Sequence, residues 1–385
     1  MTQTIAPRPS TARRPRLGFS ASLARLDWVL IGGALALSLL GVVLVWSATL
    51  VDDGGQSGRR QVLSLIMALG LAFAVTRVEP RALRAWAVPL YGGAVIGMLA
   101  VFTPLGVEVA GARAWLALPG GFTIQPSELA KVALIVVTAT ILTGARSRGE
   151  DATASDTSKC LLLVAPLLLI VLAQRDTGSA LVMVGIVAAM LLVSGAPGRI
   201  LLPVAGGLTL VAAAAFMFDA LPDYQMARLT AFVDPEADAF GAGHNTIQAR
   251  IAIGAGGLFG AGLFAGSQTQ GNFVPVHESD FIFTVLAEEL GLIGVIGLLG
   301  LLGLVCWRGI RIGFRARDPF GRVLAVGVVA WFAFQSFENI GMALGVTPIT
   351  GVTLPFVSYG GTSMIAAWLG IGLLQLVHLG RVSRV

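Results

Sequence analysis

Charged residues are scarce in this chain. Only 12% of its 385 residues are Asp, Glu, Lys or Arg, whereas 56% are hydrophobic. A soluble globular domain carries about 25% charged residues. The composition therefore excludes an ordinary soluble protein and predicts a polytopic membrane protein.

Cysteine and histidine are also rare, which limits metal and redox chemistry. The two cysteines, Cys160 and Cys306, fall at predicted span ends on the cytoplasmic side, so we expect no disulfide. The three histidines form no HExxH or similar pattern, which argues against a zinc site. A cleavable signal is not expected either, because residues 1–26 contain five arginines and no apolar run.

Long apolar runs occupy most of the chain. A run of about 20 apolar residues can cross the hydrocarbon core as a helix. The sequence predicts an all-α polytopic fold with about ten transmembrane helices, at 28–50, 61–76, 85–103, 128–143, 161–174, 177–194, 199–218, 280–306, 321–345 and 358–379. A large extracytoplasmic loop, 219–279, is predicted between the seventh and eighth spans.

Basic residues sort to one side of these spans. Ten spans place both termini on the same side, and 19 of the 26 Lys and Arg residues fall there. By the positive-inside rule both termini are cytoplasmic. This sorting accounts for the net charge of +5, so we predict no nucleic-acid partner. The predicted domains are a disordered tail at 1–27, a membrane domain at 28–380 and a C-terminus at 381–385.

The large loop contains a glycine-rich amphipathic run at 246–262. We predict that it is partly helical and is packed on the outer face or re-entrant. Its glycines superficially resemble a nucleotide-binding loop, but no strand precedes them, so close backbone packing is the favoured reading. No internal repeat is evident, which disfavours common secondary-transporter folds.

Four carboxylates lie within twelve residues at the start of the predicted eighth span: Glu278, Asp280, Glu288 and Glu289. An ionised Asp at the bilayer centre costs about 2.5–3.5 kcal/mol, so such residues usually face a bundle interior or a wet cavity. Two explanations remain open at this point. The acids are structural and paired, or they perform chemistry at the membrane surface.

Other outward span ends also carry charge. Glu128 and Lys131 are three residues apart and share a helix face, which is equally consistent with an ordinary ion pair. Asp176 is equally consistent with a solvated turn. Arginine binds phosphate oxygens bidentately, and a partly desolvated carboxylate can act as a general base. Together these groups suggest group transfer from a lipid-linked phosphate donor.

Four motifs at these positions resemble the SEDS family (shape, elongation, division and sporulation) of peptidoglycan polymerases. They are QPSELAK at 125–131, IGAGGL at 253–258, HESDFIF at 277–283 and PFVSYGG at 355–361. The resemblance covers about residues 28–380 and favours the RodA branch over the FtsW branch. Two positions depart from the usual family pattern: Glu278-Ser279-Asp280 replaces His-Thr-Asp, and Gln174-Arg175-Asp176 replaces Gln-Pro-Asp.

The resemblance implies a glycosyltransferase that polymerises lipid II at the outer face of the bacterial cytoplasmic membrane during cell elongation. Undecaprenyl diphosphate would leave, and a class B penicillin-binding protein, a transpeptidase, would be the partner. Asp280 would be the general base of an inverting reaction. The implied substrate-binding residues are Arg60, Arg113, Glu128, Lys131, Asp176, His277 and Ser358. The acidic members, Glu128 and Asp176, would orient the basic ones or a divalent cation, Mg²⁺ or Mn²⁺.

Two other functions remain as alternatives, besides an FtsW-type polymerase acting in division. A lipid II flippase or other transporter would need charges at mid-membrane and on both faces. Glu289 and Glu338 could line such a pathway, but we expect them to be structural acids paired with nearby Gln335 and Asn339. A non-catalytic scaffold that docks a transpeptidase is the third possibility.

Overall fold

The computed structural model describes residues 24–109, 112–118, 122–144, 151–217, 223–238 and 243–382. The predicted tails at 1–27 and 381–385 lie largely outside these ranges. Each of the ten predicted spans corresponds to a helix, and the all-α polytopic fold is confirmed. The ten helices are α2 (Trp28–Asp53), α3 (Gln56–Thr76), α5 (Ala87–Ala100), α6 (Pro126–Thr143), α7 (Ala154–Ala173), α8 (Thr177–Val193), α9 (Gly198–Met217), α13 (Ile282–Phe314), α14 (Pro319–Leu344) and α15 (Gly361–Val382).

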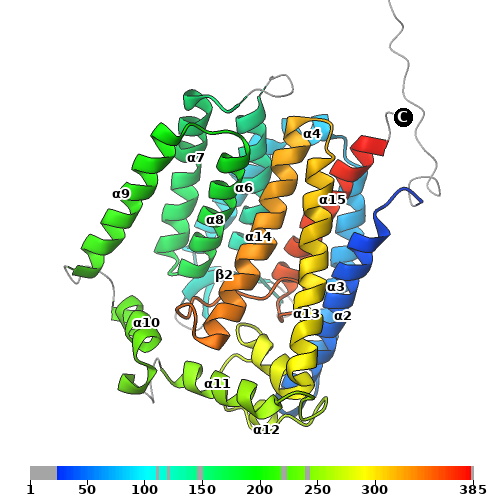
Figure 1. Ribbon diagram of the computed structural model, residues 1–385, viewed down its shortest axis with the longest axis vertical. Coiled ribbons are helices and arrows are strands. Elements are labelled where there is room, and N and C mark those ends of the chain that lie inside the picture. Colours follow the sequence, from blue (N-terminus) through cyan, green and yellow to red (C-terminus); the bar gives the residue numbers. More distant parts are fainter. Residues whose placement is uncertain are drawn as a thin grey trace, which may run out of the picture.

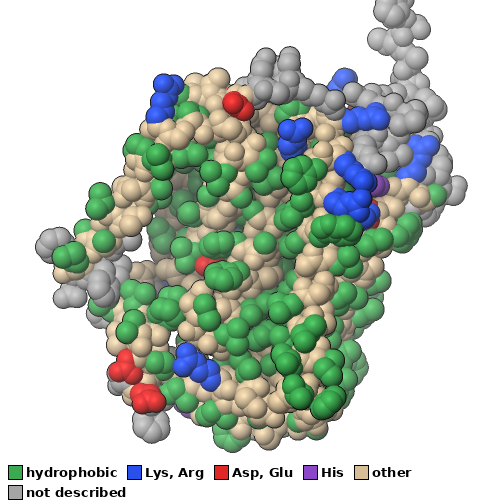
Figure 2. Space-filling model, viewed as in Figure 1, with side chains coloured by type: hydrophobic (Ala, Val, Ile, Leu, Met, Phe, Trp, Pro, Cys, Tyr) green, Lys and Arg blue, Asp and Glu red, His purple; other side chains and the backbone are tan. Residues whose placement is uncertain are grey.

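Seven of these helices are long and apolar enough to cross a membrane, and the apolar stretches of α5, α8 and α9 are shorter. Figure 1 shows them packed as a bundle, with α9 splayed out at one edge. In the view of Figure 2, most Lys and Arg side chains lie toward the end of the bundle where α4 and the C-terminus are found. The band between the two ends is mostly hydrophobic on this face.

The first and last helices are joined by a polar contact at that end. The Asp27 backbone N–H donates to Gln375 Oε1, and Gln375 Nε2 donates to the Asp27 carbonyl, each at 3.0 Å. The Asp27 carboxylate also forms an ion pair with Arg308 of α13 at 2.5 Å. The chain therefore begins and ends its bundle on the same side, as an even number of crossings requires.

Short elements cover both ends of the bundle. They are α4 (Pro80–Ala85), α10 (Asp223–Val233), the 3-10 helix η1 (Pro235–Asp238), α11 (His244–Gly256) and α12 (Ser267–Gln270). The last four belong to the large loop between α9 and α13, at the end opposite α4 (Figure 1). The prediction of partial helix in this loop is confirmed by α11.

The connection between α5 and α6 forms a small antiparallel sheet, where the sequence analysis saw only a loop. Strands β1 (Gly106–Val109), β2 (Ala112–Leu118) and β3 (Phe122–Ile124) pair in the order β1-β2-β3. Trp115 pairs with Val107, and Leu116 pairs with Ile124. Alternation of small and large side chains along ARAWLAL suits a pleated strand.

Helix α13 is interrupted in its N-terminal part. Gly291 has φ 64 and ψ −163, so two helical segments meet there at a break. A break in a span leaves backbone groups without their usual helical partners, which is costly in lipid unless other protein groups replace them. The segment that follows α11 provides these groups in two matched pairs. In the first pair, the N–H groups of Ala261 and Gly262 donate to the carbonyls of Glu288 and Glu289 at 2.9 and 3.0 Å. In the second pair, the N–H groups of Leu292 and Ile293 donate to the carbonyls of Gly257 and Leu258 at 3.0 and 3.3 Å.

Glycine permits this close approach. A Cβ atom at Gly260 would lie 2.1 Å from the Glu289 carbonyl oxygen, and one at Gly256 would lie 1.9 Å from the Ala287 oxygen. Such distances are impossible for other residues without a backbone shift. The glycine-rich run is therefore a packing device against α13, as the favoured reading of the sequence predicted.

Candidate active site

Asp280 lies just before α13, where two irregular segments meet at the end of the bundle opposite α4. Ser279 Oγ donates to Asp280 Oδ1 at 3.1 Å, and Asn339 Nδ2 of α14 donates to the Asp280 carbonyl at 2.7 Å. The connection 345–360 between α14 and α15 packs against this segment. Its Ser358 Oγ donates to the Ser279 carbonyl at 2.5 Å, and its Tyr359 N–H donates to the Glu278 carbonyl at 2.9 Å.

The environment of Asp280 makes it a stronger base than an ordinary carboxylate. Burial raises its pKa to about 6, and the negative charges of Glu278 and Asp176 add to this effect. The hydrogen bond from Ser279 and the positive charge of Arg228 lower the pKa, but they do not cancel the effect of burial. The carboxylate is therefore mostly ionised at neutral pH, yet basic enough to accept a proton from a sugar hydroxyl during reaction.

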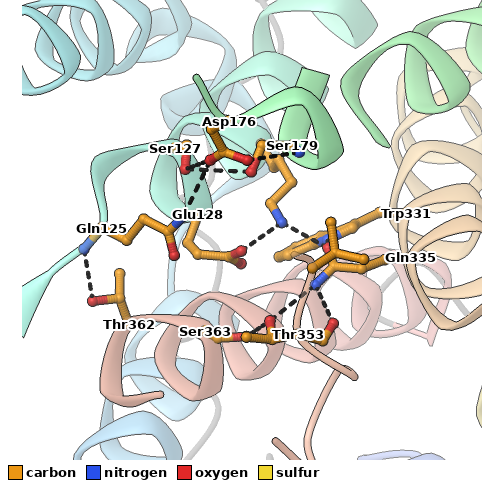
Figure 3. Close-up of polar contacts among 12 residues, drawn as sticks. Gln125, Ser127, Glu128, Asp176, Ser179, Trp331, Gln335, Thr353, Thr362 and Ser363 are labelled. Carbon is orange, nitrogen blue, oxygen red and sulfur yellow. Dashed lines mark hydrogen bonds and ion pairs between the residues drawn. The ribbon is translucent and has the colours of Figure 1, made fainter. Parts of the chain in front are cut away.

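Asp176 joins the starts of α6 and α8 (Figure 3). Its Oδ1 accepts the Ser179 N–H at 3.0 Å and so caps α8, while Oδ2 accepts from Gln125 Nε2 at 3.1 Å and from Ser127 Oγ at 3.2 Å. The residue is only 7% exposed, so the solvated turn considered in the sequence analysis is wrong. Carboxylate capping of a helix N-terminus is favourable in itself, and it fixes Asp176 near Asp280.

Lys131 is fully buried at the centre of a second polar network. Its Nζ donates to Glu128 Oε1 at 2.7 Å and to Gln335 Oε1 at 2.6 Å, and it lies 5.2 Å from the centre of the Trp331 ring. Gln335 Nε2 continues the network to the Thr353 carbonyl at 2.8 Å (Figure 3). The expected Glu128–Lys131 contact is confirmed. Because it is buried, its partners must compensate for the loss of water.

Glu338 differs from its expected role. We expected it to pair with Gln335 or Asn339, but Gln335 is used by Lys131, and the Asn339 amide donates to the carbonyls of Asp280 and Val352. Glu338 Oε2 is buried without a hydrogen-bond partner in the described part of the chain, and Glu338 interacts electrostatically with Lys131 and Asp176. Its carboxyl group therefore lies in the same buried region as Lys131 and Asp176.

The pair Glu288-Glu289 has a structural role. Glu288 accepts hydrogen bonds from the N–H groups of Gln268 and Thr269 at 2.7 and 2.9 Å, which caps the short helix α12. Glu289 Oε1 accepts from Ser47 Oγ of α2 at 2.5 Å. These two acids hold the large loop and α2 to α13, so the structural explanation for them is correct.

His277 and Ser358 are engaged with the protein in this structure. His277 is 2% exposed, with Nδ1 2.8 Å from the Val274 carbonyl and Nε2 2.9 Å from the Ala48 carbonyl. Ser358 Oγ donates to Ser279 and accepts the Leu354 N–H at 2.7 Å. Both residues hold the segment around Asp280 in place.

The two predicted arginines lie apart from these networks. Arg113 is exposed on β2, and its Nη2 donates to the Thr103 carbonyl at 2.9 Å. Arg60 of α3 is partly buried, and its guanidinium makes no hydrogen bond or ion pair with any residue that the structure describes. Its neighbour Gln61 donates to the Ser358 carbonyl at 2.9 Å. Arg60 is therefore the predicted cation whose guanidinium is free to bind a ligand, and the next residue in α3 contacts the 345–360 connection.

The sequence analysis did not assign the neutral amides that build the site to it. Gln61, Gln125, Gln335 and Asn339 each bridge two elements. A signal was present, since Gln335 and Asn339 are four residues apart and share one face of a mostly apolar helix. Within the described ranges, no three His, Cys, Asp or Glu side chains group as metal ligands.

Comparison with known proteins gives one consistent result. A family model described as "Cell cycle protein", covering FtsW, RodA and SpoVE, matches residues 27–382. The probable peptidoglycan glycosyltransferase FtsW of Geobacter metallireducens is 37% identical over 359 residues, which is 91% of this chain and 94% of the relative. The peptidoglycan glycosyltransferase MrdB of Escherichia coli K12 is 37% identical over 363 residues, covering 92% and 94%.

Solved structures agree with these relatives. A chain of a peptidoglycan synthase complex, described as coordinating polymerization and crosslinking, has a TM-score of 0.78 at 35% identity, covering 92% of this chain and 98% of that one. The rod shape determining protein RodA of Thermus thermophilus has a TM-score of 0.68 at 33% identity, covering 92% and 97%.

Proposed function

We propose a mechanism for this chain from one premise: it belongs to the FtsW/RodA/SpoVE family of cell cycle proteins. It is a peptidoglycan glycosyltransferase, like the relatives to which it is 37% identical over most of its length. The substrate that we propose is lipid II, polymerised into glycan strands at the outer face of the cytoplasmic membrane. We assign the chain to elongation on its sequence motifs, although its relatives carry both the FtsW and the MrdB names.

Asp280 acts as the general base. It takes the proton from the 4-hydroxyl of the acceptor GlcNAc, and that oxygen forms a bond to the anomeric carbon of the donor MurNAc. The bond from this carbon to the diphosphate breaks, and its electron pair leaves with undecaprenyl diphosphate. A β-linkage formed from an α-diphosphate inverts the centre in one displacement, so one base suffices. The observation that carries this proposal is the partly buried Asp280, with its raised pKa, at the junction of the two outer segments.

The departing diphosphate needs positive charge. Arg60, with its uncommitted guanidinium, is the proposed direct contact, because a guanidinium can bind two phosphate oxygens at once. Lys131 donates hydrogen bonds to Glu128 and Gln335, so it acts on the diphosphate through its electrostatic potential rather than by direct contact. Arg113 would approach the donor from the sheet. Glu128 and Asp176 hold these parts in place from within the protein.

The proposed partner is a class B penicillin-binding protein. The similarity to a chain from a complex that coordinates polymerization with crosslinking supports this assignment. The alternative of a transporter gains no support from the site: Glu128 and Lys131 near the start of α6, Asp176 at the start of α8 and Glu338 near the end of α14 belong to the same end of the bundle as Asp280.

The decisive experiment compares Asp280→Asn with wild type. Purified protein, with its transpeptidase partner, is incubated with labelled lipid II, and the products are separated on a gel. We expect loss of polymer by at least about 100-fold, because general bases contribute about 10²–10⁴-fold. Glu278→Gln is the matched control, since it removes a neighbouring charge and leaves the base in place. Near wild-type polymer from Asp280→Asn, at normal thermal stability, would show that the base assignment is wrong.

A further inference from the structure

Val276 has an unusual backbone conformation four residues before Asp280. Its φ is 55, in the left-handed region. A β-branched residue is a rare outlier there, because its Cβ substituents crowd the backbone. Its side chain is 40% exposed, so burial of the side chain does not explain the conformation. Outliers of this kind persist only where the surrounding structure imposes them, and they concentrate at functional sites.

The conformation has a direct consequence for the carbonyl of Val276. This one oxygen accepts hydrogen bonds from three successive backbone N–H groups, those of Ser279 at 3.2 Å, Asp280 at 3.1 Å and Phe281 at 3.4 Å. The segment is fixed on its other side by His277, whose ring lies between the carbonyls of Val274 and Ala48. The Val276 carbonyl is therefore the single acceptor that holds the turn containing Asp280.

Both peptide groups of Asp280 are thus held. Its N–H donates to Val276, and its carbonyl accepts from Asn339 of α14. In contrast, its carboxylate accepts one hydrogen bond from the residues that the structure describes, that of the adjacent Ser279. The direction of the carboxylate therefore depends mainly on how the backbone is held.

We propose that Val276 is a positioning residue for Asp280: the strained backbone at 276 sets the direction in which the carboxylate points. The proposal rests on the role of Asp280 as general base. Its physical basis is that a misplacement of about 1 Å at a reacting group can cost about 100-fold in rate.

Val276→Gly tests this directly, because glycine adopts the same conformation without strain and also many others. We expect kcat for lipid II polymerisation to fall about 10- to 100-fold, while KM stays within about twofold and the melting temperature stays equal or rises. A purely structural role for Val276 would instead lower stability and leave kcat unchanged.

The pH profile gives a second readout. The charged groups that act on Asp280 are Glu278 in its own segment, Asp176 at the start of α8 and Arg228 on α10. If the freed turn lets the carboxylate reach water, the acid limb of kcat shifts from near pH 6 toward the ordinary carboxyl value of about 4.

Two further variants complete the test. Val276→Asn should restore at least about half of the wild-type kcat, because Asn tolerates the left-handed region better than other non-glycine residues. Phe264→Gly is the matched control: Phe264 has φ 64 in the same extracytoplasmic loop, and its replacement should move neither kcat nor the acid limb.

The outcomes separate the two proposals. An active Asp280→Asn variant would show that Asp280 is not the general base. An inactive Asp280→Asn together with a Val276→Gly of wild-type kcat and pH profile would overturn only the positioning role. A Val276→Gly variant that melts well below wild type would show that the backbone at residue 276 is not strained. A Val276→Asn variant with a kcat as low as that of Val276→Gly would show that the backbone conformation does not determine kcat. Either result also overturns the positioning role.

Discussion

Asp280 links activity and stability to pH in opposite directions. Its folded-state pKa is about 6, above the ordinary value of 3.8, because burial disfavours its charge. Between these two values the folded chain binds more protons than the unfolded chain, so this group makes the fold more stable as pH falls. The same protonation removes the base.

We therefore expect kcat at pH 5 to be about tenfold below its plateau, since about one tenth of the Asp280 side chains remain ionised there. Over the same range the contribution of Asp280 to the melting temperature should rise. Initial rates and thermal melts at pH 5–8 measure both quantities, and Asp280→Asn should remove this component of the stability profile. A kcat that stays flat down to pH 5 would contradict the raised pKa.

Lys131 can be tested as a structural or an electrostatic residue. Lys131→Met leaves the Glu128 carboxylate buried without its cation, which should destabilise the fold by about 3–5 kcal/mol. The double variant Lys131→Met with Glu128→Gln removes both charges and should recover most of this loss. Denaturation of the two variants measures the recovery.

The activity of the double variant separates the two roles. If the positive charge of Lys131 stabilises the departing diphosphate electrostatically, the double variant polymerises slowly although its stability is recovered. Full recovery of activity together with stability would make Lys131 purely structural, and Arg60 would then be left as the main candidate for the diphosphate.

At the scale of elements, the break in α13 depends on glycine in the segment that crosses it. Gly260→Ala places a Cβ 2.1 Å from the Glu289 carbonyl oxygen, and Gly260 has φ 78. We expect a loss of about 3 kcal/mol or more, because both the contact and the conformation are incompatible with alanine. Thermal melting of the purified chain measures this loss.

Gly254→Ala is the control from the same glycine-rich run. It lies within α11, and a Cβ there meets nothing within 4 Å. Alanine favours a helix over glycine by about 1 kcal/mol, so this variant should be neutral or slightly stabilising. Equal effects at the two positions would mean that the run is not packed against α13 as described.

The sequence predicted most elements because their signals are local. Apolar runs located all ten bundle helices, and Pro126 marked the start of α6. The sheet was missed because its strands are short and their pairing is not visible in composition. In the site, Asp280 could be predicted because it lies within a family motif. Asn339 and Gln335 belong to the site only through their tertiary contacts with Asp280 and Lys131. Glu338 was assigned the wrong partners because sequence proximity does not determine which amides it meets.

At the scale of the whole molecule, the orientation in the membrane is still a prediction from charge. Single cysteines at Glu236 and at Asp318 test it, because both positions are exposed. Glu236 lies in η1 of the large loop, whereas Asp318 pairs with Arg84 of α4 at the opposite end of the bundle. In intact spheroplasts, an impermeant maleimide should label the cysteine at 236 and not the one at 318. The reverse pattern would place Asp280 on the cytoplasmic side and contradict the proposed reaction at the outer face.

The contact of Asp27 with Arg308 and Gln375 has a consequence for biosynthesis. The first span enters the membrane early in translation, but the groups that neutralise and bond its flanking aspartate are made more than 280 and nearly 350 residues later. Until these residues are made, α2 lies in the lipid without its contacts to α13 and α15. The contacts at this end of the bundle can form only after α13 and α15 have been made, so assembly of the bundle depends on these two later helices.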